Sequence, residues 1–165
     1  RYFAFIPSQR LIFFEKDSLF GRDVQLKFPS ATNEIRDIGN CMALDLHTAA
    51  VFHCMRVVEH GLRALAIHLK VKVKYPLEFA EWGVIIKGID RKLADLQPKA
   101  RGKKKAEALE FYRLANDDCN MFKDVWRNSV MHTRGRFPEH EALGVFLRVQ
   151  SFMQRLSQRN IGEVS

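Results

Sequence analysis

The fold is decided by residues 48–59, TAAVFHCMRVVE, whose apolar side chains recur at the spacing of an α-helix. The pattern continues to Leu69, and Gly61 within it would let a neighbouring helix approach closely. Glu59 and Arg63 stand at the i, i+4 spacing of a helical ion pair. The apolar face consists of Ala50, Val51, Cys54, Val57, Val58, Gly61, Leu62, Leu65 and Leu69. The stretch therefore predicts a long helix with one face in a core.

The rest of the chain predicts further helices on both sides of this one. Helical character begins at Ser30 and runs to Leu69, as one bent helix or as two that meet near 39–44. A second helix is expected from Pro76 to Gln97, a third over 104–131 and a fourth from Pro138. Asp118 lies inside the apolar stripe of the third helix and needs a partner there. Short connections between helices favour an all-α fold, an antiparallel helical bundle of four to five helices. The apolar stripe of the third helix is Phe111, Leu114, Ala115, Met121, Phe122, Val125 and Trp126.

Residues 1–29 differ from the remainder in composition. They are rich in phenylalanine and are interrupted by Pro7, Gly21 and Pro29, which favours extended or irregular segments packed on the helices. We therefore expect an N-terminal arm over 1–29 and a helical domain over 30–165 within one compact unit.

Composition indicates which classes of partner and which cellular setting suit the chain. The formal net charge of +8 favours a polyanion, of which nucleic acid is the commonest, although charge alone specifies none. Three cysteines are too few and odd in number for a disulfide framework, which favours a reducing, cytoplasmic setting. No apolar run reaches the length of a membrane span, and no secretion signal is expected.

The end of the third predicted helix carries Arg127-Asn128-Ser129-Val130-Met131-His132, an R-N-x-x-x-H string. A guanidinium can hold a phosphodiester, and an imidazole that titrates near neutrality can move the 2′-hydroxyl proton of RNA. Because the helix is expected to end there, His132 could leave the regular projection and converge with Arg127.

The spacing of an arginine and a histidine five residues apart is weak evidence for a catalytic motif on its own. With fifteen arginines and six histidines, an R-x4-H pair should arise by chance roughly half a time in this chain. Arg63 and His68 form such a pair, but in a continuous helix they point about 140° apart. Arg127 differs because a polar amide follows it and because the helix ends nearby. One copy supplies one imidazole, so a twofold homodimer would be needed to provide a base and a separate acid.

The segment 125–132 resembles the signature of the HEPN superfamily (higher eukaryotes and prokaryotes nucleotide-binding), and residues 48–59 resemble its early core helix. The resemblance covers roughly 30–160. It implies an all-α bundle, often dimeric, in which an R-x4-6-H motif with a polar residue after the arginine lines a cleft across the dimer axis.

The resemblance also implies an activity. Many members are metal-independent endoribonucleases of toxin-antitoxin or defence systems that leave a 2′,3′-cyclic phosphate. Arg127 would hold the scissile phosphate, His132 would act as base or acid, and Asn128 would orient the histidine or the substrate. RNA and an antitoxin protein are the implied partners, and no cofactor is expected. The residues expected to bind RNA are Arg134, Arg136, Arg56, His60 and Arg63.

Other interpretations of these residues remain open. Arg127 and His132 would also suit a helix C-terminus, where cations are favoured and can cap carbonyls. His53 and His60 lie about 10 Å apart along a helix, too far for one metal ion without a third ligand, so no metal site is expected. His60 could instead line a helix interface. Other HEPN proteins bind RNA, nucleotide or a partner protein without cutting, which leaves a non-catalytic helical module as the alternative function.

Overall fold

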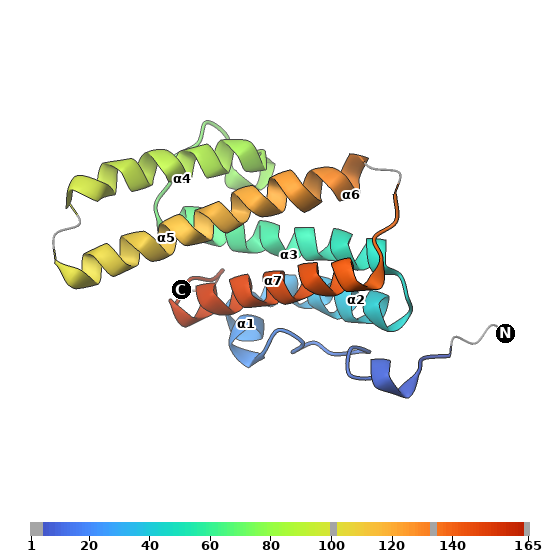
Figure 1. The fold of residues 1–165 in the computed structure, drawn as a ribbon. Coiled ribbons are helices and arrows are strands. Elements are labelled where there is room, and N and C mark those ends of the chain that lie inside the picture. The colour runs from blue at the N-terminus through green and yellow to red at the C-terminus, as the bar shows by residue number, and fades with distance from the viewer. Residues whose placement is uncertain (1–4, 100–101, 133–134, 164–165) are drawn as a thin grey trace.

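A computed structural model describes residues 5–99, 102–132 and 135–163, and within these ranges the fold is all-α, without a strand (Figure 1). Because α5, a π-helical segment η5 and α6 are continuous, five long helical segments form a bundle with roughly aligned axes, as predicted. The elements are α1 (Arg22–Lys27), α2 (Thr32–Ala43), α3 (His47–His68), α4 (Trp82–Leu96), α5 (Lys103–Met121), η5 (Phe122–Arg127), α6 (Asn128–His132) and α7 (Glu139–Gln158).

The predicted helical run from Ser30 to Leu69 is two helices, α2 and α3, rather than one bent helix. Asp45 adopts a left-handed conformation with φ of +60°, and the Leu46 N–H donates to the Cys41 carbonyl at 2.8 Å. This backbone bond is that of a Schellman cap, which satisfies the carbonyls at the end of α2. The chain then turns back, so α2 packs along α3.

The second predicted helix begins later than expected. Pro76 precedes only one 3-10 turn, Leu77–Phe79, and the backbone is extended at Ala80 and Glu81. The α-helix α4 therefore starts at Trp82, and the prediction of a start at Pro76 is wrong. An isolated turn after a proline does not have to continue as a helix when the following residues adopt extended ψ values. The predicted end near Gln97 is confirmed.

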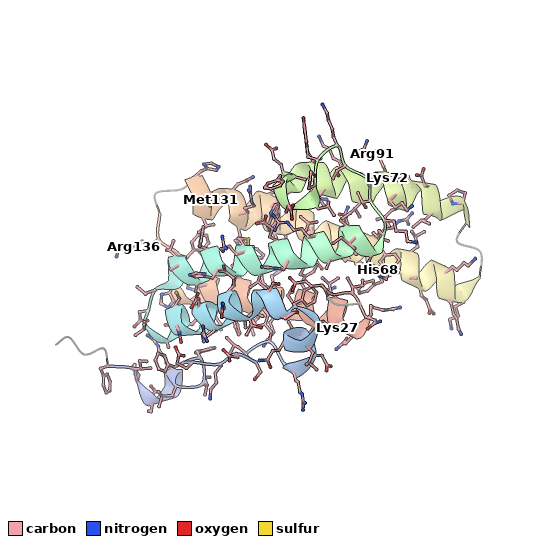
Figure 2. All side chains as sticks on the ribbon, turned by 180° about the vertical axis from the view of Figure 1, so that it is seen from behind. Lys27, His68, Lys72, Arg91, Met131 and Arg136 are labelled. Atoms are coloured by element: carbon pink, nitrogen blue, oxygen red, sulfur yellow. The ribbon has the colours of Figure 1, made fainter. Side chains whose placement is uncertain are left out.

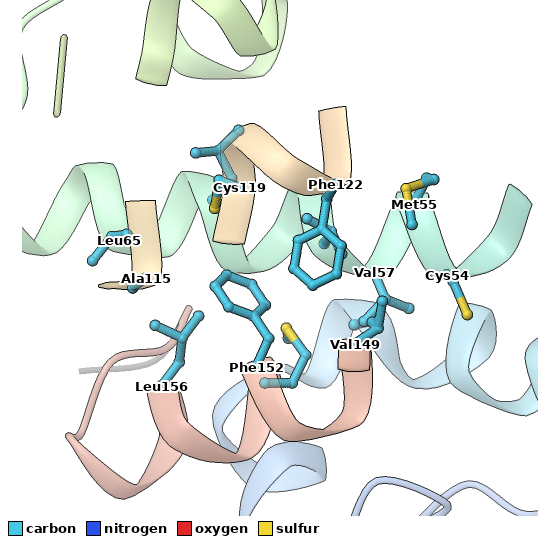
Figure 3. Close-up of a cluster of buried hydrophobic side chains, with 14 of the residues drawn as sticks. Cys54, Met55, Val57, Leu65, Ala115, Cys119, Phe122, Val149, Phe152 and Leu156 are labelled. Atoms are coloured by element: carbon cyan, nitrogen blue, oxygen red, sulfur yellow. The ribbon is translucent and has the colours of Figure 1, made fainter. Parts of the chain in front are cut away.

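The core lies where α3, α5 with η5, and α7 meet (Figure 3). Its labelled side chains include Leu65 from α3, Phe122 from η5 and Phe152 from α7. Gly61 allows the contact between α3 and α7, because a Cβ at this position would lie 2.6 Å from Phe152 Cε1 and 2.9 Å from Met153 Sδ. The expected close helix approach at Gly61 is thus confirmed.

The buried face of the third helix was only partly predicted. Ala115 and Phe122 are buried, but Leu114 is 50% and Val125 is 52% exposed, so the prediction is wrong for these two. Leu114 lies about 100° from Ala115 on the flank of the helix, and the π-helical turn of η5 moves Val125 out of the regular projection. Asp118 does have a partner, since Arg155 of α7 donates to its carboxylate.

The N-terminal arm is packed on the bundle and shares its core. Phe13 and Phe20 make edge contacts with Phe146 of α7, at ring-centroid distances of 5.8 and 5.6 Å, and Phe28 is fully buried. The arm also contains a short helix, α1, that was not predicted. Within the described residues, the helices include none with the length and apolarity needed to cross a bilayer.

Candidate nucleic-acid interface

The R-N-x-x-x-H motif lies where the third helix changes its hydrogen-bonding pattern. Arg127 is the last residue of the π-helical segment η5, and Asn128 to His132 form α6. The helix therefore extends one residue beyond the expected end at Met131. Short π-helical segments inside α-helices are frequent at functional sites, because they displace side chains from the regular face.

Arg127 is half-buried and lies against the first residue of α4. Its Cζ atom is 5.3 Å from the centroid of the Trp82 ring, and Trp82 itself is buried. This cation–π contact restrains the guanidinium, whose N–H donors can still bind an anion such as a phosphate. The contact between Arg127 and Trp82 was not predicted from the sequence.

His132 is exposed and is the last residue of α6. The expectation that it leaves the helix and converges with Arg127 is not met. Five residues of helix separate the two side chains by about 140° around the axis and about 7.5 Å along it. Asn128 is exposed at the first position of α6. One chain therefore does not place the guanidinium and the imidazole on the same face.

A groove of about 800 Å³ opens at the end of the bundle that carries α6. In Figure 2, Met131 and Arg136 lie at this same end, where the chain turns from α6 towards α7. Thr48 Oγ1 accepts a hydrogen bond of 3.0 Å from the Phe137 N–H, which holds this turn against α3. The groove is lined by Asp45, Leu46, His47, Thr48, Ala49, Phe52, Val130, Arg136 and Phe137.

The charged side chains that line the groove are one carboxylate, Asp45, and one arginine, Arg136, and His47 Nε2 lies 3.6 Å from the Asp45 carboxylate. Arg136 is exposed at its edge, and His47 lies in its wall. The Asp45 carboxylate is bound by Arg10 of the N-terminal arm, so its charge is largely compensated. The groove therefore combines an available cation with aromatic and aliphatic surface, which suits a nucleotide. His47, Thr48 and Phe137 were not predicted as groove residues, because only the tertiary fold brings them together.

Three of the other residues expected to bind RNA, all in α3, are held in contacts within the chain. Arg56 Nε donates to Glu34 Oε1 at 2.5 Å, and His60 Nδ1 lies 2.6 Å from a carboxylate oxygen of Glu163. Arg63 donates to Glu59, as predicted. Arg136 is the one that lies at the groove, whereas Arg134 is outside the described residues. These three α3 residues are therefore engaged with carboxylates rather than grouped with the motif.

Glu34 connects α2 to two basic side chains of α3. His53 Nδ1 lies 2.7 Å from Glu34 Oε2, opposite the Arg56 contact. Burial of the Glu34 carboxyl raises its pKa, but the hydrogen bonds from His53 and Arg56 outweigh this effect and hold the pKa below its ordinary value. The cluster is thus a structural connection between helices.

The second R-x4-H pair, Arg63 and His68, points in two different directions, as predicted. Arg63 donates to the Glu78 carbonyl at 2.8 Å, whereas His68 Nε2 lies 3.0 Å from the Tyr112 hydroxyl on a different helix. Over the ranges that the structure describes, histidine, cysteine and carboxylate side chains form no group of three that could hold a metal ion.

Comparisons with known proteins give no match for this chain among family models, curated proteins or solved structures.

Proposed function

We propose that the chain is a metal-independent endoribonuclease of the HEPN type that acts as a homodimer. The observation that carries the proposal is the exposed His132 imidazole at the end of α6, at the same end of the bundle as the groove that Arg136 borders. An exposed imidazole can exchange a proton with a substrate, and the groove offers an adjacent surface for the RNA strand.

The proposed roles follow from side-chain chemistry. Arg127, restrained by Trp82, would bind the scissile phosphate and stabilise the charge that builds on it. His132 would remove the proton of the ribose 2′-hydroxyl or protonate the leaving 5′-oxygen. Attack by the 2′-oxygen on phosphorus breaks the bond to the 5′-oxygen and leaves a 2′,3′-cyclic phosphate and a 5′-hydroxyl. Asn128 would orient the phosphate or the imidazole.

A second copy is part of this proposal because Arg127 and His132 diverge within one chain. Two copies related by a twofold axis could face each other at the ends of α6, so that the arginine of one copy and the histidine of the other share one substrate. Such a cleft would also contain two imidazoles, one for each proton transfer.

Cleavage of mixed RNA in EDTA tests the proposal. The wild type should give 2′,3′-cyclic phosphate ends, and Arg127→Ala or His132→Ala should lower the rate at least about 100-fold. Matched controls are Arg148→Ala, which also removes an arginine stacked on a tryptophan, and His140→Ala, which removes an exposed histidine of α7. Wild-type activity in the motif variants, or equal losses in the controls, would reject the assignment.

Mixing the two inactive variants tests the shared cleft. A mixed dimer of Arg127→Ala and His132→Ala keeps one guanidinium and one imidazole from different copies. It should cleave faster than either parent but more slowly than wild type, because only one of the two proton transfers keeps its imidazole. If mixed dimers form, as measured with two affinity tags, and remain as inactive as each parent, the shared cleft is wrong.

One observation favours a second candidate, a non-catalytic helical module that binds RNA, nucleotide or a partner protein. The packing of Arg127 on Trp82 is a contact that would also stabilise the fold without any substrate. This candidate predicts RNA binding by wild-type protein with no cyclic phosphate ends. The toxin, defence and antitoxin associations of HEPN proteins extend to this chain only as part of the main proposal.

A further inference from the structure

The connection between α3 and α4 presents lysines and aromatic rings on the surface. Along residues 70–74, exposed lysines alternate with half-buried valines. Val71 packs against α4 at Gly88, where a Cβ would lie 2.6 Å from Val71 Cγ1. Over residues 71–74 this alternation is that of an extended chain with one face on a core and the other in solvent, and Lys70 precedes it in a left-handed conformation at the end of α3. The alternation directs Lys72 and Lys74 outward, and Lys70 is exposed as well.

Two aromatic side chains follow the lysines and remain exposed. Tyr75 is 61% and Phe79 is 78% exposed, although both could bury large apolar areas. They border a hollow of about 450 Å³ that also includes Val84 of α4. Several exposed apolar side chains around one hollow indicate a contact surface rather than isolated surface residues. We call residues 70–84 the α3–α4 surface.

This surface is fixed to the rest of the bundle near the motif. The Glu78 carbonyl accepts a hydrogen bond of 2.8 Å from Arg63 of α3, which anchors the turn that carries Phe79. Trp82 follows the hollow directly in sequence and contacts Arg127. The residue that contacts the motif cation therefore comes three positions after Phe79 in the chain.

We propose that the α3–α4 surface binds single-stranded RNA, with bases stacked on Tyr75 and Phe79 and phosphates along the lysines. Proteins that hold single strands combine aromatic stacking surfaces with a row of cations, which is the combination found here. Within the described residues, Lys70, Lys72 and Lys74 take part in no ion pair. Lys74 Nζ lies 5.4 Å from the centroid of the Tyr75 ring, so a base would stack on the other face of that ring or displace the ammonium towards a phosphate. The proposal rests on the ribonuclease function and names the surface that holds its substrate.

The charges of the α3–α4 surface favour the phosphates on one side of it. The lysines precede Tyr75, whereas Glu78 and Glu81 follow it. Phosphates are therefore favoured on the side of Lys70 to Lys74, and only uncharged bases are compatible with the carboxylate side near Phe79.

Binding of a short fluorescent 2′-O-methyl RNA, which lacks the attacking hydroxyl, tests the surface separately from cleavage. Tyr75→Ala with Phe79→Ala should weaken binding by roughly tenfold or more, because a stacked base is lost at each ring. Phe5→Ala is the matched control, since it removes an exposed phenylalanine of the N-terminal arm. Unchanged binding in the double variant, or an equal loss in the control, would overturn the proposal.

The salt dependence of the same binding tests the lysines. Lys72→Gln with Lys74→Gln should reduce the slope of log affinity against log salt concentration by about 1.4, at about 0.7 for each lost phosphate contact. Lys16→Gln, an exposed lysine of the arm, should leave the slope unchanged. Wild-type protein should bind the RNA and not vesicles of phosphatidylserine and phosphatidylcholine. A preference for the vesicles, or an unchanged slope, would reject RNA as the ligand.

The two proposals fail in different ways. Binding that depends on Tyr75 and Phe79 without any cyclic phosphate product would keep the surface and reject the ribonuclease. Cleavage that depends on Arg127 and His132 but not on Tyr75 and Phe79 would keep the ribonuclease and reject the surface.

Discussion

The Arg127 guanidinium rests on Trp82, with Cζ 5.3 Å from the ring centroid, so a cation of the motif is held by the first residue of α4. Arg127→Lys should keep the charge but lose the planar fork of donors that binds a phosphate through two bonds. We expect cleavage to fall at least about tenfold, while the free energy of unfolding changes by less than about 1 kcal/mol. Arg148→Lys, at the analogous contact with Trp126, should not alter cleavage. Equal effects of the two variants on the initial rate would contradict this role.

Gly61 should be sensitive to the addition of one methyl group. Alanine there would place its Cβ 2.6 Å from Phe152 Cε1 and 3.1 Å from Leu156 Cδ1, which forces α3 and α7 apart. The expected loss is about 1 to 3 kcal/mol in the free energy of unfolding. Gly144→Ala in α7, where the added Cβ meets nothing within 4 Å, should instead stabilise by up to about 1 kcal/mol. Urea denaturation of both variants measures the contrast, and a stabilising Gly61→Ala would disprove the close packing.

Glu34 should contribute to stability in a pH-dependent way. Because its folded pKa lies below the ordinary value of 4.5, ionised Glu34 stabilises the fold above that pH, and the contribution disappears as the pH falls through the folded pKa. The difference in unfolding free energy between wild type and Glu34→Gln should therefore be largest near neutrality and shrink below about pH 4.5. Glu107→Gln, an exposed carboxylate of α5, is the control. If this difference in unfolding free energy grew as the pH fell, the ionised form of Glu34 would not be the stabilising one.

Lys70 adopts a left-handed conformation, with φ of +54°, at the end of α3. A Schellman cap places it there, since the Val71 N–H donates to the Ala66 carbonyl at 2.9 Å. Lys70→Gly should raise the free energy of unfolding by about 0.5 to 1 kcal/mol, because glycine adopts this conformation without strain. Lys72→Gly, in the extended segment, should not stabilise. Thermal melting of both variants decides the matter, and a destabilised Lys70→Gly would argue against backbone strain.

The cysteines should differ in their reaction with a thiol reagent. All three are free, and Cys54 and Cys119 are fully buried. Burial raises the pKa of both thiols, so neither should form the reactive thiolate in the folded protein. Alkylation of native protein, followed by intact mass, should modify Cys41 alone, and all three should react in denaturant. Rapid native modification of Cys119 would show that the α3, α5 and α7 core opens readily.

The helical bundle could be predicted from sequence because its signals are local. The apolar period of residues 48–65, the prolines before α7 and near the end of α4, and the i, i+4 pair of Glu59 and Arg63 each depend on neighbours in the chain. The start of α4 was missed because a proline favours a helix start but does not require one.

The candidate site was harder to predict because its contacts are between distant segments. No pattern in the sequence pairs Arg127 with Trp82, or brings Thr48 to Phe137. The carboxylate partners of Arg56 and His60 come from α2 and from the segment after α7. A cation on a helix face therefore counts as available for a ligand only after the tertiary partners of that face are known.

The π-helical turn of residues 122–127 contains one residue more than a regular helix needs for the same rotation. Deleting one residue between 122 and 126 would therefore restore a regular helix and leave His132 at nearly its present rotation relative to α5. The extra residue is absorbed where the helix widens, and α6 continues the axis of α5 without a change of register.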